Sequence, residues 1–73
     1  MSNLFFPKKT LNKMQSIGIS EHYIYDIFHS GTAIKGKNGL YKKYPGYEVG
    51  LFYKLDNQTG EYHIIAVWKK DRR

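Results

Sequence analysis

The chain has 73 residues, enough for one domain, and a domain of this size buries only about 60% of the surface that its unfolded chain exposes. It contains no cysteine, which excludes a disulfide framework and a thiolate metal site. Twelve Lys and Arg residues against six Asp and Glu residues give a net charge of +6. This charge favours an anionic partner such as RNA, DNA, an acidic protein or an anionic membrane. Small domains also carry such a charge for solubility alone.

Residues 1–7 form a predicted N-terminal arm. Its apolar run at residues 4–6 is far too short for a signal peptide, and we expect it to fold onto the core because three exposed apolar residues in a row favour aggregation. A proline then leads into a first helix over residues 8–17, where Leu11 and Met14 form a narrow apolar stripe.

Gly18, Ile19 and Ser20 predict the connection between two helices. Gly18 ends the first helix in the left-handed conformation, and Ile19 is expected to contact that helix. Ser20 is the predicted N-cap of a second helix over residues 21–30, with its hydroxyl accepting from helix amides. The apolar face of this helix must dock on the protein because ten residues are not stably helical alone. That face consists of Tyr23, Ile24, Ile27 and Phe28, and the opposite face carries His22, Asp26 and His29.

Beyond Gly31 the period of apolar residues changes from 3.6 to 2, which predicts strands. The first hairpin joins strands over residues 32–37 and 40–44 through Asn38-Gly39, a dipeptide typical of turns with positive φ at both positions. After a turn at Pro45-Gly46, the third strand covers residues 47–55 with clean alternation. The fourth strand covers residues 61–69, and we expect it at the centre of the sheet because its middle is apolar on both faces.

The predicted fold is therefore α+β, with two N-terminal helices packed on one face of a four-stranded antiparallel meander (ααββββ). Residues 1–73 form one domain in this prediction, with the arm over residues 1–7 and a basic tail over residues 70–73.

The sequence predicts no metal or cofactor site. His22 and His29 are two helical turns apart, too far to share a metal ion. No P-loop, dinucleotide-binding motif or nucleophile elbow is present, and we interpret Gly36, Gly39 and Gly46 as turn glycines rather than as a phosphate cradle.

Basic residues interleaved with aromatic residues are the most informative chemical pattern. Lysines neutralise phosphates and tyrosine rings stack on unpaired bases. The alternative is that lysines on an edge hairpin prevent aggregation while the tyrosines cover the core. The candidate nucleic-acid-binding residues are Lys35, Lys37, Tyr41, Lys42, Lys43, Tyr44, Lys69, Lys70, Arg72 and Arg73.

A metal-independent ribonuclease needs an acid, a base and cations that stabilise charge on phosphorus. His63 is the best acid or base candidate, with cations from Lys9, Lys13 or Lys35; Tyr53 or Glu48 could assist. The simpler interpretation of His63 is a solvated residue at a hairpin end. The five-residue loop before it leaves its face open, since a one-residue slip in register moves a side chain to the other face.

Three segments, over residues 13–20, 23–31 and 59–68, resemble small bacterial domains of unassigned function that are grouped with the barnase–EndoU–colicin–RelE ribonuclease-toxin superfamily. The resemblance covers residues 9–70. The family's histidine falls on Lys9, and its two arginines fall on Lys13 and Ile17. If those positions are catalytic, the resemblance implies that this chain has lost a base and one cation, and that it binds without cutting.

We therefore expect a small cytoplasmic domain similar to ribonuclease toxins that binds RNA, with cleavage left open. The alternative is an interaction protein, encoded by a phage or mobile element, that inhibits an acidic host protein; a plain structural module is the third interpretation. A protein partner would be that host protein or an antitoxin. The lack of cysteine fits a reducing cytosol, and no segment approaches the ~20 apolar residues of a membrane span.

Overall fold

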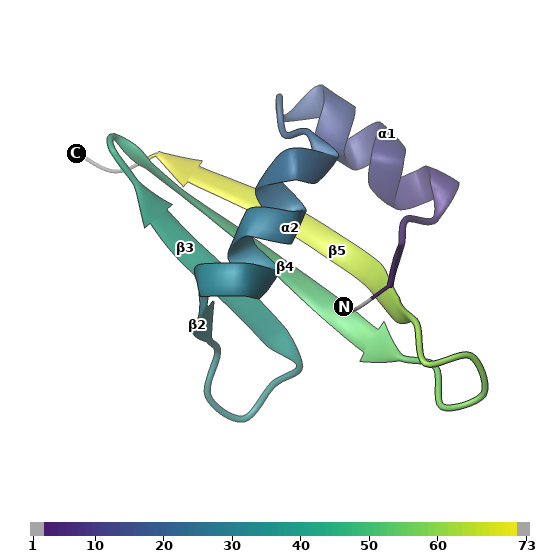
Figure 1. Cartoon of the computed structure of the whole chain (residues 1–73). Coiled ribbons are helices and arrows are strands. Elements are labelled where there is room, and N and C mark those ends of the chain that lie inside the picture. The colour runs from purple at the N-terminus through teal and green to yellow at the C-terminus, as the bar shows by residue number, and fades with distance from the viewer. Residues whose placement is uncertain (1–2, 72–73) are drawn as a thin grey trace.

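The computed structural model of the chain describes residues 3–71. Figure 1 shows its elements, which follow the order β1 (Leu4–Phe5), α1 (Lys8–Ser16), α2 (Glu21–Ser30), β2 (Thr32–Ala33), β3 (Gly39–Tyr44), β4 (Tyr47–Leu55) and β5 (Tyr62–Asp71). Within residues 3–71, neither helix has the length and apolar character needed to span a membrane.

The strands form one sheet in the order β1-β5-β4-β3-β2. β1 pairs in parallel with the start of β5, and the remaining pairs are antiparallel. The predicted α+β class is confirmed, but the sheet has five strands and is mixed because the N-terminal arm contributes β1. Tyr62 donates its backbone N–H to the Asn3 carbonyl at 2.9 Å, while Leu4 and Phe6 pack against the core.

The predicted basic tail over residues 70–73 is wrong in its first half. β5 continues to Asp71, where it pairs with Tyr47 at the start of β4, so Lys70 is a strand residue. Arg72 and Arg73 lie outside the described residues.

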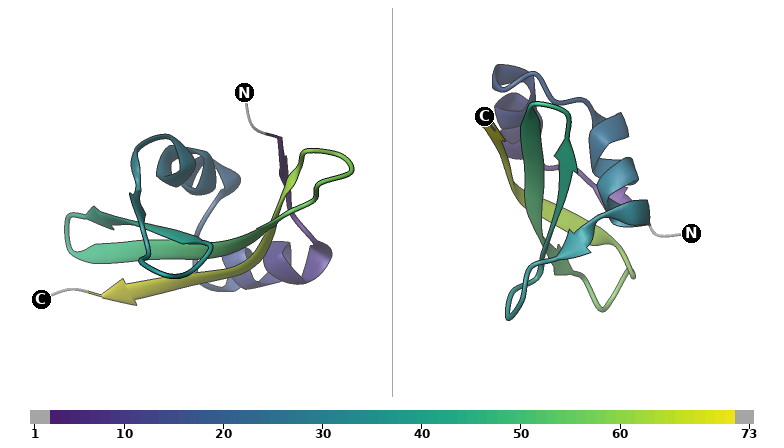
Figure 2. Two further views of the ribbon diagram at one scale, coloured as in Figure 1. Left: turned by 90° about the horizontal axis from the view of Figure 1, so that it is seen from below. Right: turned by 90° about the vertical axis from the view of Figure 1, so that its left-hand side faces the viewer.

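The two helices occupy different places on the sheet. α2 crosses one face, as both views in Figure 2 show, whereas α1 runs beside the outer edge of β5 (Figure 1). At that edge the Thr10 hydroxyl donates to the backbone carbonyl of Ile64 at 2.6 Å. The prediction that both helices pack on one face therefore holds for α2 and not for α1.

The predicted break at Gly18 is confirmed in detail. Gly18 has a φ of 75° and donates its N–H to the Gln15 carbonyl, while Ile19 donates to the Met14 carbonyl at 2.9 Å. These two hydrogen bonds make up a Schellman motif, in which a hydrophobic contact joins the residue after glycine to the last turn. Met14 and Ile19 are both buried in the core, so this motif also positions α2. Ser20, by contrast, makes no side-chain capping hydrogen bond.

The turn before β3 lies earlier in the chain than predicted. Lys37 donates its N–H to the Ile34 carbonyl at 3.2 Å, and Gly36 has a φ of 76°, whereas Asn38 and Gly39 lack positive φ. This is a four-residue turn with glycine at the third position. The first predicted strand is consequently too long, since β2 has only two residues, and Gly39 is a strand glycine rather than a turn glycine.

A β-bulge divides β5. Ile64 pairs with Tyr53, but Ala66 pairs with Phe52, so Ile65 has no partner of its own and its side chain is 57% exposed. One extra residue reverses the faces of all residues that follow it. The bulge explains the run of apolar residues in β5, because Ile65 and Ala66 are exposed on it. As predicted, this strand lies inside the sheet rather than at its edge, since β1 and β4 flank it; β4 is the middle strand, and β1 pairs with only two residues of β5.

The core lies between α2 and the face of the sheet that it crosses, which we call the covered face. Its side chains are at most 4% exposed: Met14, Ile19, Ile24, Ile27, Val49, Leu51, Ile64 and Val67. α2 contributes two of them from its predicted apolar face, and Tyr23 and Phe28 pack around them. The face of the sheet opposite α2 is thereby left without a helix across it (Figure 2).

Candidate nucleic-acid interface

The open face is the side of the sheet opposite α2. Strand register and side-chain alternation place nine side chains on it: Tyr41, Lys43, Glu48, Phe52, Lys54, His63, Ala66, Trp68 and Lys70. Trp68 and Lys70 are on this face only because the bulge precedes them. Of these nine side chains, three are lysines and only one, that of Glu48, is a carboxylate, so this face is basic.

Two aromatic rings of the open face lie directly over glycines. A Cβ atom added to Gly50 would stand 2.1 Å from Cζ2 of Trp68, and one added to Gly39 would stand 2.8 Å from Cδ1 of Phe52. The rings thus occupy the space in which side chains of neighbouring strands would otherwise stand. Both residues are half-buried, which leaves ring surface available to a ligand.

Lysines lie near these rings at two places on the open face. The Lys37 ammonium lies 6.0 Å from the centroid of the Phe52 ring. Lys43 and Lys70 flank Glu48 in register on the two neighbouring strands, so the one carboxylate of this face has a cation on either side. An anionic ligand on the two rings, which together we call the binding platform, would therefore meet Lys37 beside Phe52, and Lys43 and Lys70 beside Glu48.

The structure divides the predicted nucleic-acid-binding residues between the two faces. Lys37, Tyr41, Lys43 and Lys70 converge on the open face. Lys42, Tyr44 and Lys69 lie on the covered face instead, and Lys35 lies in the turn between β2 and β3.

Lys42 and Tyr44 belong to a polar network with α2. Lys42 Nζ is 2.7 Å from the Asp26 carboxylate and donates to the Ser30 hydroxyl at 2.8 Å, while the Tyr44 hydroxyl donates to Asp26 at 2.7 Å. The hydrogen bonds from Lys42 and then Tyr44 hold the pKa of Asp26 below its ordinary value. Burial, followed by the nearby Asp26 carboxylate, raises the pKa of Tyr44. Asp26 was predicted on the face of its helix opposite the apolar residues. It instead connects α2 to β3 through its contacts with Lys42 and Tyr44.

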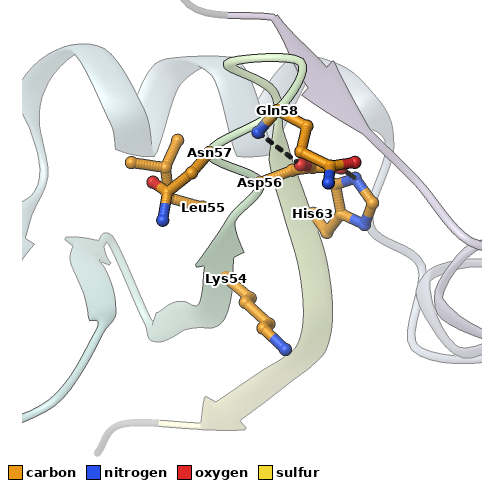
Figure 3. A pocket seen from close by; sticks show the side chains of 6 residues that line it. All are labelled: Lys54, Leu55, Asp56, Asn57, Gln58 and His63. Atoms are coloured by element: carbon orange, nitrogen blue, oxygen red, sulfur yellow. Dashed lines mark hydrogen bonds and ion pairs between the residues drawn. The ribbon is translucent and has the colours of Figure 1, made fainter.

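His63 lies at the loop end of the open face (Figure 3). Its ring centroid is 4.9 Å from that of Phe5, and its Nε2 is 3.7 Å from a carboxylate oxygen of Asp56, beyond hydrogen-bonding distance. The Gln58 backbone N–H, 2.9 Å from Asp56, is the main cause that holds the pKa of Asp56 below its ordinary value. A pocket of about 490 Å³ at this end is lined by Lys54, Leu55, Asp56, Asn57, Gln58 and His63.

The other two predicted catalytic residues lie elsewhere. Lys9 and Lys13 are exposed on α1, and with Thr10 they line a depression of about 220 Å³ beside residues 65–67 of β5. As far as residues 3–71 show, this depression shares no lining residue with the pocket at His63. The structure therefore does not gather the predicted acid or base and its two cations in one pocket.

Residues 3–71 contain no cluster of three or more His, Cys, Asp or Glu side chains that could hold a metal ion.

Phe52 and Trp68 are the functional candidates that the sequence interpretation missed. Alternation along β4 places Phe52 and Gly50 on the face that Leu51 does not occupy. This alternation is the sequence signal that could have identified Phe52 as an open-face residue. Trp68 had no such signal, because its face depends on the bulge.

Comparisons of the chain with protein-family models, with curated proteins and with solved structures found no match. The geometry of the open face is therefore the basis for inferring function.

Proposed function

We propose that this protein binds single-stranded RNA on its open face. The observation that carries the proposal is the pair of rings, Trp68 over Gly50 and Phe52 over Gly39, within a border of lysines. Stacking of an unpaired base on an aromatic side chain contributes about 1–3 kcal/mol and tolerates any sequence, and lysines that neutralise phosphates add affinity that depends on salt.

The rings favour a single strand over a duplex. Bases in a double helix are stacked on one another and present only their edges, whereas unpaired bases can be splayed onto aromatic side chains. Stacking itself does not distinguish RNA from DNA. The choice of RNA rests on the resemblance of residues 9–70 to ribonuclease toxins, which is part of the same proposal.

Binding without cleavage is the form of the function that we propose. His63 and the pair Lys9 and Lys13 line separate depressions, and His63 is too far from Asp56 for a hydrogen bond that would orient its ring. We expect total RNA to remain intact with an excess of protein in EDTA. Fragments that disappear in the His63→Ala variant would contradict this part of the proposal and leave the binding platform untouched.

Fluorescence anisotropy with a short, unstructured, labelled RNA tests the binding. We expect Trp68→Ala and Phe52→Ala each to weaken binding by about 5-fold to 150-fold, the equivalent of 1–3 kcal/mol of lost stacking. Tyr25→Ala is the matched control, because Tyr25 is a 49% exposed aromatic residue on α2, away from the open face. Equal losses in all three variants, or binding unaffected by salt, would overturn the proposal.

An acidic protein is the competing partner, since the same lysines would attract it. Flat rings beside cations favour bases and phosphates over carboxylates, which have no large face to stack. A stoichiometric protein complex that forms through the open face, survives nuclease treatment and is lost in Trp68→Ala would replace RNA as the partner.

A further inference from the structure

The depression between α1 and β5 adjoins the open face. Ala66 belongs to both, because it lines the depression with Lys9 and Lys13 and stands in register with Phe52 on the open face. Lys9 and Lys13 are four residues apart, so they lie on the same side of α1. The lysines of α1 therefore border the platform along β5.

A row of residues crosses the sheet from this border. Ala66 on β5, Phe52 on β4 and Gly39 on β3 are successive partners in register, which spans two strand spacings or about 10 Å. The small residues on either side leave the Phe52 ring as the prominent group of the row. At the far end, the ammonium of Lys37 lies 6.0 Å from the ring centroid.

The lysines at both ends of this row are available to phosphates. Within residues 3–71 the ion pairs are Lys42 with Asp26 and His63 with Asp56, so Lys9, Lys13 and Lys37 have no carboxylate partner there. All three are exposed.

Carboxylates mark the two ends of the sheet on either side of the row. Glu48 lies on the open face towards the Pro45-Gly46 turn, and Asp56 lies beside His63 towards the opposite loop. A polyanion that ran along the strands towards the loop end would approach Asp56, whereas one that crossed the strands through Phe52 would stay away from that carboxylate.

From this arrangement we infer that a bound RNA strand crosses the sheet perpendicular to the β-strands, with its phosphates held by Lys9 and Lys13 on one side and by Lys37 on the other, and a base on Phe52. The inference rests on the proposed function. It gives Lys9 and Lys13 a role in phosphate binding, in place of the catalytic role that the sequence predicted.

The salt dependence of RNA affinity tests this path. For single strands the slope of log K against log salt is about −0.7 per neutralised phosphate. We expect Lys9→Ala, Lys13→Ala and Lys37→Ala each to reduce the magnitude of the slope by about 0.7, and Phe52→Ala to lower affinity with no change in slope. Lys8→Ala is the matched control, because Lys8 is an exposed lysine of the same helix that does not line the depression.

Two outcomes separate this inference from the proposed function. If Lys9→Ala and Lys13→Ala change the slope no more than Lys8→Ala while Trp68→Ala still loses affinity, the crossing path is wrong and the open face remains the binding site. If Trp68→Ala and Phe52→Ala bind as tightly as the native chain, the proposed function fails first. Circular dichroism of each lysine variant verifies the fold, since these exposed side chains support no described ion pair.

Discussion

Leu51 and Phe52 are neighbours on β4, yet they belong to opposite regions of the molecule. Leu51 faces α2 and is fully buried, whereas Phe52 lies half-buried on the open face, over Gly39. On the covered face, apolar groups are enclosed by α2 and polar groups are joined by hydrogen bonds. On the open face, rings lie over glycines, and Lys37 lies beside the Phe52 ring. A single strand thus supplies the core with one set of residues and the proposed ligand with the other.

The largest expected contrast in stability is between these two neighbours. Leu51→Ala removes a fully enclosed side chain, and we expect a loss of about 2–5 kcal/mol in the free energy of unfolding. Phe52→Ala should cost less stability, because that ring is half-exposed, while it lowers RNA affinity. Urea denaturation of both variants measures the difference. Equal losses of stability would show that the open face is a second core rather than a binding platform.

Gly50→Ala should disturb the open face itself. The new Cβ would stand 2.1 Å from the Trp68 ring, so the indole must move, and we expect overpacking to cost about 1–3 kcal/mol along with weaker RNA binding. Gly60→Ala is a suitable control, because Gly60 has a φ of 76° and open space around it. That control should lose about 1–2 kcal/mol through backbone strain and retain RNA affinity. Native affinity in Gly50→Ala would show that the position of Trp68 is unimportant.

Acid should weaken the covered face through Asp26. Its pKa is lowered in the folded protein, so its contribution to stability is fully present above the unfolded value of about 3.9 and is lost as the pH falls through the folded value. We expect Asp26→Asn to flatten the decline of unfolding free energy below about pH 4. Asp56→Asn should also flatten it, because the pKa of Asp56 is lowered too. Urea denaturation across a pH series measures both, and an unchanged acid limb in Asp26→Asn would contradict the network.

The smallest effect is expected at the start of α2. A serine N-cap usually contributes about 1 kcal/mol through its side-chain hydrogen bond. Ser20 makes no such bond, so Ser20→Ala should change the free energy of unfolding by less than about 0.5 kcal/mol. Thermal unfolding measures this change. A loss near 1 kcal/mol would mean that capping, and not only packing, holds α2 over the covered face.

Local signals made much of the fold predictable. Residues 47–55 were predicted with the bounds that β4 has, because alternation over nine residues leaves one consistent phase. The glycine and isoleucine at positions 18 and 19 encode a motif whose hydrogen bonds span only a few residues. The length of α2 and its buried face followed from periodicity in the same way.

The features that the sequence did not predict depend on partners far away in the chain, or on an interruption in the alternation of faces along a strand. β1 pairs with residues 58 positions later, and two residues carry no local sign of that pairing. Between Ile64 and Trp68 every residue is apolar, so no polar side chain marks which residue leaves the pattern. The dipeptide Asn38-Gly39 led to a wrong turn prediction. Gly39 is a glycine because a Cβ there would meet the Phe52 ring, and the sequence does not distinguish such a glycine from a turn glycine.

Because of the bulge, the fold needs a residue at position 65, and the type of that residue matters less. The side chain is 57% exposed, so Ile65→Thr should be tolerated. Deleting the residue would instead exchange the two sides of everything downstream, sending the indole and Lys70 towards α2 and Val67 and Lys69 outwards. Length, rather than composition, is therefore the constraint on this half of β5, and a change of one residue there would cost both the core and the proposed binding surface at once.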